Sequence, residues 1–381
     1  MKYGHLERIN LTLRTLSPLF IGSGEKLSKK EYILDPKKAI IYFPHPHLPK
    51  FMVFLQQRGI LVDYEAFLLQ SRQNDLRAFL QDHHIEEKDY QHFVAYHIPA
   101  GEAIKSLQFR EVLTFLKGAD GRPYIPGSSI KGAIRTALGA LLIKSVDRQR
   151  FIKQVQNADH RGNIRWYLNQ EENSLEQKLF CRLEYKDTSG KMDLSKSPIN
   201  DIMRGIQISD SAPLDYERLT LCGKVDRKPD GSVNSLPIFR ECLMPGSEAR
   251  MVMTLDLPML KRAGWDKYTI EQALHQFADE HYANYEQSFP EDNNDAPIAA
   301  QQGVDMILGG GAGYVSKTLM YNLFNERKEA MSMVSQIMHR QFKTHGHNKD
   351  LNQHRVSPHT LKTTRYQELY YQMGRCELIL G

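Results

Sequence analysis

One stretch in the first half of the chain, residues 124–135, most constrains what the sequence can fold into. Its sequence is Tyr-Ile-Pro-Gly-Ser-Ser-Ile-Lys-Gly-Ala-Ile-Arg. The Pro-Gly pair ends an extended segment, and Ser128 or Ser129 can cap the helix that follows. Behind the serines, apolar side chains recur at helical spacing on one face, at positions 130, 133, 134, 137, 138, 141 and 142. The stretch therefore predicts a strand that runs directly into an amphipathic helix.

The same junction is a candidate phosphate site. Ser128 and Ser129 offer hydroxyl groups, while Lys131 and Arg135 are four residues apart and share a neighbouring face within the first two turns. Free backbone N–H groups and the positive end of the helix dipole would meet these two cations at one place. The alternative interpretation is structural, with a glycine-serine turn that opens an ordinary helix and with both cations on its solvated face.

A second candidate site is the glycine-rich loop at residues 309–318, Gly-Gly-Gly-Ala-Gly-Tyr-Val-Ser-Lys-Thr. A strand-like segment, 304–308, precedes it and a helical pattern, 317–338, follows it. Such a junction suits a loop whose N–H groups surround an anion. The residues that we expect to contribute to binding are Gly309, Gly310, Gly311, Gly313, Tyr314 and Lys317.

Two other interpretations of this loop remain open. A nucleotide-binding P-loop needs a glycine directly before its Lys-Thr pair, and Ser316 stands there, which argues against ATP hydrolysis. A glycine-rich turn shaped only for tight packing is the other alternative. Lys317 distinguishes packing from anion binding, since packing has little need for a lysine there.

Composition limits the kinds of partner that the sequence allows. The 381 residues are 41% hydrophobic and 25% charged, with a formal net charge of +5. This mildly basic balance permits a polyanionic partner without requiring one. No segment has the apolar length of a membrane helix, and the first residues lack the apolar stretch of a signal peptide. We therefore expect a chain with no membrane association.

Cysteine and histidine usage argues against a metal or cofactor. The four cysteines are widely spaced and contain no Cys-x-x-Cys pair, so a disulfide framework or a cysteine-based zinc site is not expected and a reducing cytoplasm fits best. The fifteen histidines are scattered. His45 with His47 and His345 with His347 form local pairs, but neither has a second pair nearby. We expect no metal and no cofactor.

The rest of the chain mixes strands with helices. Apolar alternation or β-branched runs predict strands at 9–13, 32–34, 39–43, 111–116, 202–211, 238–243, 251–255 and 378–380. Residues 50–97 show helical spacing and are expected to form an insertion that serves as a partner surface or cover. Thr269-Ile-Glu-Gln272 matches a capping box, and the helix it opens should bury Ile270, Ala273, Leu274, Phe277, His281 and Tyr285. The fold class is α+β with an antiparallel sheet.

The end of the first predicted strand is a third candidate site. Gly22 and Gly24 flank Ser23 and let the backbone approach a ligand closely, or merely make a tight turn. Lys26, Lys29 and Lys30 follow, so the segment is cationic.

These motifs together resemble the RAMP superfamily, the proteins that build CRISPR RNA-guided complexes. Residues 125–135 resemble its signature Ile-Pro-Gly-Ser-Ser-Leu-Lys-Gly-x-x-Arg, with Ile130 in place of leucine. The glycine turn after the first strand is similar too, with Phe20 where histidine is frequent. Three further segments resemble the family in the order it has them, namely Ser209-Asp-Ser211, the Arg240-Glu pair followed by Pro245-Gly246, and the late glycine-rich loop.

The resemblance implies a ferredoxin-like, RRM-related fold in which helices pack on an antiparallel sheet, elaborated by insertions. It allows two ferredoxin-like halves. We accordingly expect a core over residues 1–210 with a helical insertion at about 45–97, and a second half over 211–381 that carries the loop 309–318.

Within the family, the length, the insertion and the late glycine loop are most similar to the subunit that caps the 3′ end of the guide RNA in type III-A CRISPR (Csm) complexes. This implies a non-catalytic, RNA-binding protein of antiviral defence. Its partners would be the guide RNA, other Csm-complex subunits, above all the adjacent backbone subunit, and host nucleases that trim the guide. The three candidate sites above would hold the RNA backbone.

Two alternatives stay open. Some relatives are endoribonucleases that process the guide precursor, and His5, His92 and His97 are available for such chemistry. In backbone subunits an aspartate after the first strand cuts target RNA, but the first aspartate here is Asp35, inside a predicted hairpin turn, which argues against that role. The other alternative is a head or backbone subunit of a type III-B complex.

Overall fold

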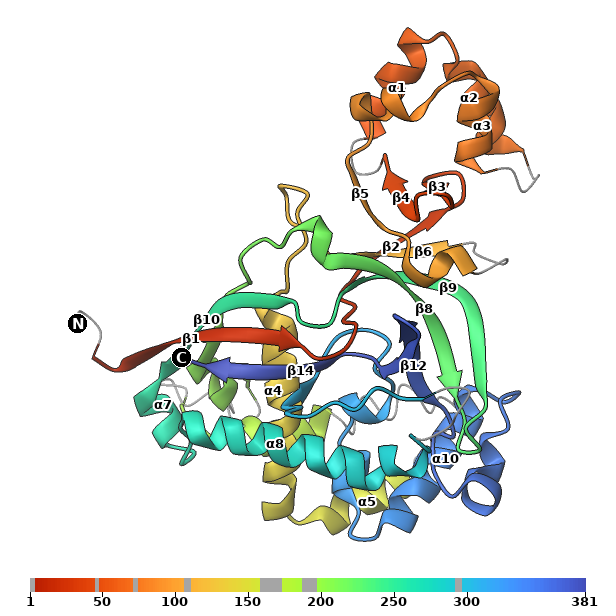
Figure 1. The fold of residues 1–381 in the computed structure, drawn as a ribbon. Helices are drawn as coiled ribbons and strands as arrows, with labels where there is room; N and C mark the ends of the chain where they lie inside the picture. The colour runs from red at the N-terminus through yellow and green to blue at the C-terminus, as the bar shows by residue number, and fades with distance from the viewer. Residues whose placement is uncertain are drawn as a thin grey trace.

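The computed structural model describes residues 4–44, 48–70, 75–105, 111–157, 173–186, 197–291 and 297–381. Within these residues the fold mixes helices with three mainly antiparallel sheets, which confirms the α+β class (Figure 1). No helix in the described ranges is long and apolar enough to cross a membrane.

Sheet A is built around the first strand. Its order is β11-β14-β1-β10-β7, with bounds Met306–Ile307, Arg375–Leu380, Leu6–Thr15, Glu248–Asp256 and Ile206–Ile208. All four pairings are antiparallel, and Leu11 faces Met251 on one side and Leu380 on the other. Ile9, Leu11 and Leu13 are buried, as their alternation predicts. The strand predicted at 202–211 is shorter, because residues 202–205 form a 3₁₀ turn before β7.

Two helices, α4 (Gly127–Leu142) and α8 (Lys267–Asn284), pack against each other beneath sheet A (Figure 1). In chain order the elements of this layer are β1, α4, β7, β10, α8 and β14. The largest buried cluster includes Leu11 from β1, Ile134 from α4 and Phe277 from α8. Apolar residues on the inner face of each helix therefore form one core with sheet A.

The start of α4 differs from its prediction in one detail. The helix begins at Gly127 with Pro126 as its N-cap, so Ser128 and Ser129 lie in the first turn and neither caps it. Gly127 packs against β7 so closely that a Cβ there would be 2.2 Å from the carbonyl oxygen of Ile208. Only glycine fits this contact, and it fixes where the helix can start.

The start of α8 also differs. Asp266 is its N-cap, and its carboxylate accepts a hydrogen bond from the N–H of Thr269 at 2.8 Å. The capping box predicted at Thr269–Gln272 is therefore wrong, because Asp266 provides a strong cap three residues earlier. The buried face is as predicted, namely Ile270, Ala273, Leu274, Phe277 and His281, with Tyr285 directly after the helix.

Sheet B contains six strands in the order β13-β12-β8-β9-β6-β2. Their bounds are Leu369–Gln372, Leu361–Tyr366, Leu219–Arg227, Val233–Leu243, Glu111–Phe115 and Gly22–Ser28. The β6–β9 pair is parallel, and the other pairings in this sheet are antiparallel. The sequence patterns did not predict β8. Strands from both sides of residue 210 contribute to sheet A and to sheet B.

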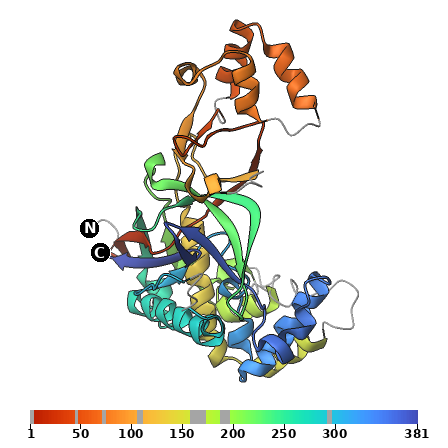
Figure 2. The ribbon, with the colours of Figure 1, turned by 45° about the vertical axis from the view of Figure 1, so that its right-hand side comes forward.

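The region predicted as a helical insertion contains helices and stands away from both larger sheets (Figures 1 and 2). Sheet C, with β3 (Ile33–Asp35), β4 (Ile40–Phe43) and β5 (Tyr96–Pro99), connects it to the rest of the chain. Its helices are α1 (Leu48–Gln57), α2 (Leu61–Leu69), α3 (Leu76–Asp82) and the 3₁₀ turn η1 (Glu87–His92). The insertion has its own aromatic-rich core, which includes Phe51, Phe54, Tyr64, Phe67, Phe79 and Phe93.

The remaining elements are short, apart from one helix near the end of the chain. They are α5 (Arg148–Asn157), a helix over 173–180, α7 (Leu257–Lys261), α9 (Met320–Leu323) and α10 (Arg327–Gln341). Single turns are η2 (Gly101–Lys105), η3 (Ile143–Ser145), η5 (Pro198–Asn200), η6 (Ile202–Gly205), η7 (Tyr216–Arg218), η8 (Glu286–Ser288), η9 (Val315–Lys317), η10 (His347–Lys349) and η11 (Asp350–His354). The region predicted as one helix over 317–338 instead contains parts of three separate elements, η9, α9 and α10. The backbone is extended at Thr318, which ends η9, and again at Phe324, which ends α9.

Candidate nucleic-acid interface

The glycine-rich loop lies on the segment that follows β1. The N–H of Gly310 donates to the carbonyl oxygen of Phe20 at 2.7 Å. A Cβ at position 309 would be 2.3 Å from the same oxygen, and the φ of Gly309 is +79°. Gly22 also contacts Phe20, since a Cβ at position 22 would be 2.9 Å from its ring. Phe20 thereby brings together two segments that were predicted as separate candidate sites.

A pocket of about 250 Å³ opens between this loop and sheet B. Its lining residues come from the loop, β8, β9 and β12, and they are Lys224, Arg240, Gly311, Gly313, Lys317, Lys362 and Thr363. Four of these seven residues are cations. The concave shape and the charge of this lining suit an anionic ligand.

Arg240 is the most deeply buried of the four cations. Its Nη1 lies 3.5 Å from the sulfur of Met373, and its guanidinium lies 5.6 Å from the centre of the Phe20 ring. Among the described residues no carboxylate lies within ion-pair distance of it. Desolvation lowers the pKa of Arg240, but an arginine stays ionised in proteins. A buried cation without a carboxylate partner is costly unless an anion reaches it.

The three lysines add charge with little compensation. Desolvation lowers the pKa of Lys224, which is half-buried, and also that of Lys317. Lys362 donates to the carboxylate of Asp226 at 2.8 Å. One carboxylate therefore faces four cations, and the pocket keeps a positive charge. The lining residues of the described structure include no carboxylate, histidine or cysteine, so the arrangement suits phosphate binding better than acid–base chemistry.

The junction at the start of α4 is the second candidate phosphate site. There the N–H of Gly127 donates to the Asp210 carboxylate at 2.9 Å, so that carboxylate already meets the helix N-terminus. Ser128 is exposed and Ser129 is half-buried. Desolvation lowers the pKa of Lys131, which has no ion pair within 4 Å among the described residues.

Arg135 differs from Lys131 because the protein itself supplies its partners. Its guanidinium donates to Asp201 at 2.8 Å and to Glu176 at 2.9 Å, and it lies 4.0 Å from the centre of the Phe180 ring. These contacts tie α4 to Glu176 and to Asp201. A phosphate would have to compete with two carboxylates for Arg135, whereas Lys131 is available.

The model of the RAMP superfamily matches residues 12–304. The chain belongs to the RAMP superfamily. The family implies a ferredoxin-like fold, and the resemblance predicted from the sequence motifs is confirmed.

Curated relatives identify the branch of the RAMP superfamily. CRISPR system Cms protein Csm5 of Mycobacterium tuberculosis is 28% identical, over 98% of each chain. Csm5 of Streptococcus thermophilus is 30% identical, over 81% of this chain and 79% of that protein. This RAMP chain is thus homologous to Csm5 over nearly its full length.

Solved structures agree at the level of the fold. The crystal structure of T. onnurineus Csm5 superposes with a TM-score of 0.61 at 19% identity, covering 96% of this chain and 99% of that one. A chain of the cryo-EM structure of a Csm–crRNA–target RNA ternary complex gives a TM-score of 0.61 at 21% identity, covering 98% of this chain and 100% of that one.

Sequence reasoning missed three of the four cations in this RAMP chain's pocket, Lys224, Arg240 and Lys362. Arg240 was noted only as part of a family pattern, yet a charged residue inside the apolar run 238–243 was a usable signal. Lys224 and Lys362 gave no such signal, because their strands meet the loop only in the folded chain. Tyr314, one of the loop residues expected to contribute to binding, is half-buried against the main core.

Proposed function

We propose that this RAMP chain is a non-catalytic, RNA-binding subunit of a type III-A CRISPR effector complex. In this proposal it holds the backbone of the guide RNA near its 3′ end, and so supports guide maturation and antiviral defence. Near full-length homology to Csm5 and the fold shared with a chain of a Csm–crRNA–target RNA complex support it. Its partners would be guide RNA, the adjacent backbone subunit and host trimming nucleases.

The cationic pocket beside the glycine loop is the observation that carries the proposal. Lys224, Lys317 and Lys362 act as point charges toward phosphate oxygens, while the planar guanidinium of Arg240 can donate two parallel hydrogen bonds. Gly311 and Gly313 let the RNA backbone approach without a side chain in between. Such contacts position RNA without reading its sequence, which is what a subunit that serves many different guides requires.

We also propose that sheet A with α4 and α8 is the ferredoxin-like unit of this chain. The chain order β1, α4, β7, β10, α8, β14 and the sheet order β14-β1-β10-β7 support this assignment. A second ferredoxin-like half and the division at residue 210 stay predictions. If two halves exist they are interleaved, since strands from each side of that residue share both large sheets.

The endoribonuclease alternative gains no support from the positions of its candidate histidines. His92 stacks on Phe54 and His97 lies beside Tyr42, so both belong to the insertion. The backbone of His5 bonds to Leu257 at the edge of sheet A. None of the three lines the cationic pocket.

The test measures guide binding by the complex reconstituted with this subunit. A double variant, Lys224→Ala with Lys317→Ala, is compared with Lys328→Ala with Lys343→Ala, which removes two exposed lysines at α10. Affinity for a labelled guide RNA is measured from about 50 to 200 mM salt. We expect the pocket variant to bind about tenfold or more weakly, and its log–log salt slope to fall by about 1 for each phosphate that it no longer neutralises.

Each result has a defined meaning. If the pocket variant and the control keep the affinity and slope of the wild type, the pocket does not bind the guide. Incubation of the protein with repeat RNA in EDTA tests the alternative. Discrete cleavage products that disappear in a His92→Ala or His97→Ala variant would favour the endoribonuclease.

A further inference from the structure

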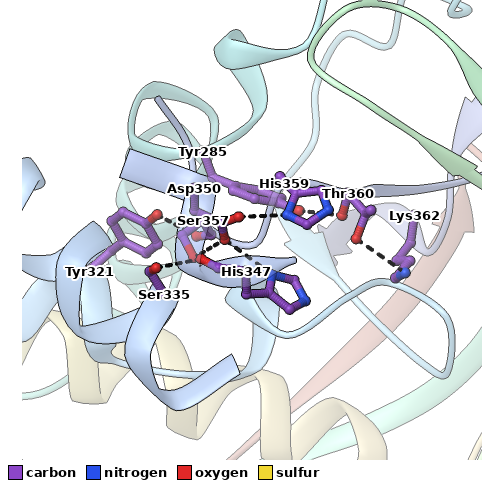
Figure 3. Close-up of polar contacts among 9 residues, drawn as sticks. All are labelled: Tyr285, Tyr321, Ser335, His347, Asp350, Ser357, His359, Thr360 and Lys362. Carbon is purple, nitrogen blue, oxygen red and sulfur yellow. Dashed lines mark hydrogen bonds and ion pairs between the residues drawn. The ribbon is translucent and has the colours of Figure 1, made fainter. Parts of the chain in front are cut away.

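Asp350 is a fully buried carboxylate held between two buried histidines (Figure 3). Nδ1 of His347 lies 3.1 Å from one of its oxygens, and Nδ1 of His359 lies 2.5 Å from the other. The hydroxyl of Ser357 donates to the first oxygen at 2.6 Å. We call His347, Asp350 and His359 the His–Asp–His cluster. None of them lines the cationic pocket.

The local fold brings these three residues together. After α10 the chain makes two short turns, η10 and η11, and reverses at Arg355, whose φ of 54° is left-handed. Ser335 on α10 donates to the carbonyl oxygen of His347 at 2.6 Å and fixes the first turn. His359 then returns to face Asp350 just before β12.

The donor set fits a transition-metal ion. One ligand atom from each residue of the cluster can be chosen so that all lie within 4.8 Å of one another. Zinc binds imidazole nitrogen and carboxylate oxygen at about 2.0–2.2 Å, which separates the ligands of a tetrahedral site by roughly 3.3 Å. The 3.1 Å and 2.5 Å contacts join the imidazoles to different oxygens of Asp350, so the carboxylate would bind the ion through both oxygens or turn to present one of them. Ligand separations of up to 4.8 Å would then close toward about 3.3 Å. Imidazole with carboxylate is a common donor set for Zn²⁺.

We propose that the His–Asp–His cluster binds a divalent transition-metal ion of the zinc class. His354 is a further imidazole at the edge of the site, with its ring 4.5 Å from that of His359. It is half-buried and offers a fourth ligand. A metal at Nδ1 needs the lone pair of that nitrogen, so each imidazole would carry its N–H on Nε2 and each Nδ1–carboxylate hydrogen bond would give way to a pair of metal bonds.

The site would fasten the segment that leads into the proposed RNA pocket. Tyr321 donates to the carbonyl oxygen of Ser357 at 2.5 Å, and Tyr285 donates to that of Thr360 at 2.7 Å. Lys362 of the pocket follows two residues later and lies 3.4 Å from the Thr360 hydroxyl (Figure 3). This consequence rests on the proposed function, whereas metal binding itself does not.

A purely hydrogen-bonded cluster is the competing explanation, because the three donors already satisfy Asp350. The experiment therefore counts metal. Purified full-length protein is stripped with a chelator and dialysed, and Zn²⁺ alone is titrated against a competing indicator dye. Metal content is then measured by elemental analysis and thermal unfolding is followed with and without Zn²⁺. We expect one ion per chain and a higher unfolding temperature with Zn²⁺.

Two variants make the result specific. His359→Gln keeps an N–H donor near Asp350 but removes the imidazole ligand, and we expect about 100-fold weaker binding or more. His345→Gln changes an exposed histidine of the same segment and should bind like the wild type. If His359→Gln does not fold, His347→Gln takes its place. Absence of a tight site in the wild type, or equal uptake by both variants, would overturn the proposal.

Discussion

Arg240 lies directly against Gly311, so that a Cβ at position 311 would stand 3.1 Å from Nη1 of its guanidinium. The φ of Gly311 is +84°, a conformation that side chains rarely adopt. The glycine loop and the buried arginine therefore determine each other's position. The loop keeps its shape above the guanidinium, and the guanidinium keeps its place only while position 311 lacks a side chain.

The first prediction is that Gly311→Ala weakens both folding and RNA binding. The left-handed backbone and the close contact with Arg240 should together lower the free energy of unfolding by about 1–3 kcal/mol. Urea denaturation and guide binding measure the two effects. Gly246→Ala is the control, since Gly246 has a φ of +79° but no atom near its Cβ position. Equal losses of RNA affinity in both variants would mean that the contact with Arg240 does not matter.

The second prediction is that Arg240→Met separates stability from binding. Met is apolar and of similar length, so it removes a buried cation that has no carboxylate partner among the described residues. The free energy of unfolding should stay the same or rise, by up to a few kcal/mol, while affinity for guide RNA falls about tenfold or more. Chemical denaturation and RNA titration, both at one salt concentration, measure the two quantities.

Arg375→Met is the matched control for Arg240→Met. Arg375 is also buried but forms an ion pair with Glu286. Its loss leaves the buried carboxylate of Glu286 without its cationic partner and should cost about 3–5 kcal/mol. If Arg240→Met destabilises the protein as much as Arg375→Met does, Arg240 has a structural role and the pocket does not need an anion.

Local patterns in the sequence predicted most of the elements but not how their side chains meet. Alternation at residues 9–13 gave β1, and helical spacing after Ser129 gave α4, because burial on one face depends on neighbours close in the chain. The start of α8 was misplaced because Asp266 outside the apolar pattern caps the helix. The strand β8 was missed, since its burial comes from pairing with β9 and β12.

In the candidate site, too, local sequence patterns do not show which side chains meet in the folded chain. The sequence suggested that Lys131 and Arg135 act together, since they are four residues apart on a helix. Arg135 instead pairs with Glu176 and Asp201, which are 41 and 66 residues away in the chain. No local pattern contains these partners. The cations that line the pocket with Lys317 likewise come from three different strands, so only the folded chain shows that they form one surface.

The third prediction therefore treats Lys131 and Arg135 separately. Arg135→Ala should lower the free energy of unfolding by about 1 kcal/mol, because Glu176 and Asp201 lose a shared partner at a partly exposed site. Lys131→Ala should change it by less than about 0.5 kcal/mol. Thermal or urea unfolding distinguishes the two. A weaker affinity for RNA in Lys131→Ala alone would support a phosphate contact at the start of α4, and an unchanged affinity would leave this junction with a structural role.

The last prediction concerns the dependence of stability on pH. His281 on α8 is buried, with Nε2 3.3 Å from the carboxylate of Glu286. Burial, together with the nearby charge of Arg375, lowers the pKa of His281 to about 3. In the unfolded chain a histidine has a pKa of about 6.5. Between these two values the unfolded state binds a proton that the folded state does not, so the free energy of unfolding falls as the pH is lowered from 7 toward 4.

The slope from this one group approaches 1.4 kcal/mol per pH unit below the unfolded pKa. From pH 7 to pH 5 the loss of unfolding free energy from this group amounts to about 2 kcal/mol. His281→Leu should remove this contribution, so the difference in unfolding free energy between variant and wild type should shift in favour of the variant as the pH falls. Urea denaturation at pH 7, 6 and 5 measures it, with His345→Gln as an exposed-histidine control. A pH-independent difference would contradict the prediction, because it requires the same histidine pKa in the folded and unfolded states. A difference that shifts in favour of the wild type as the pH falls would show that His281 is protonated and paired with Glu286 in the folded protein.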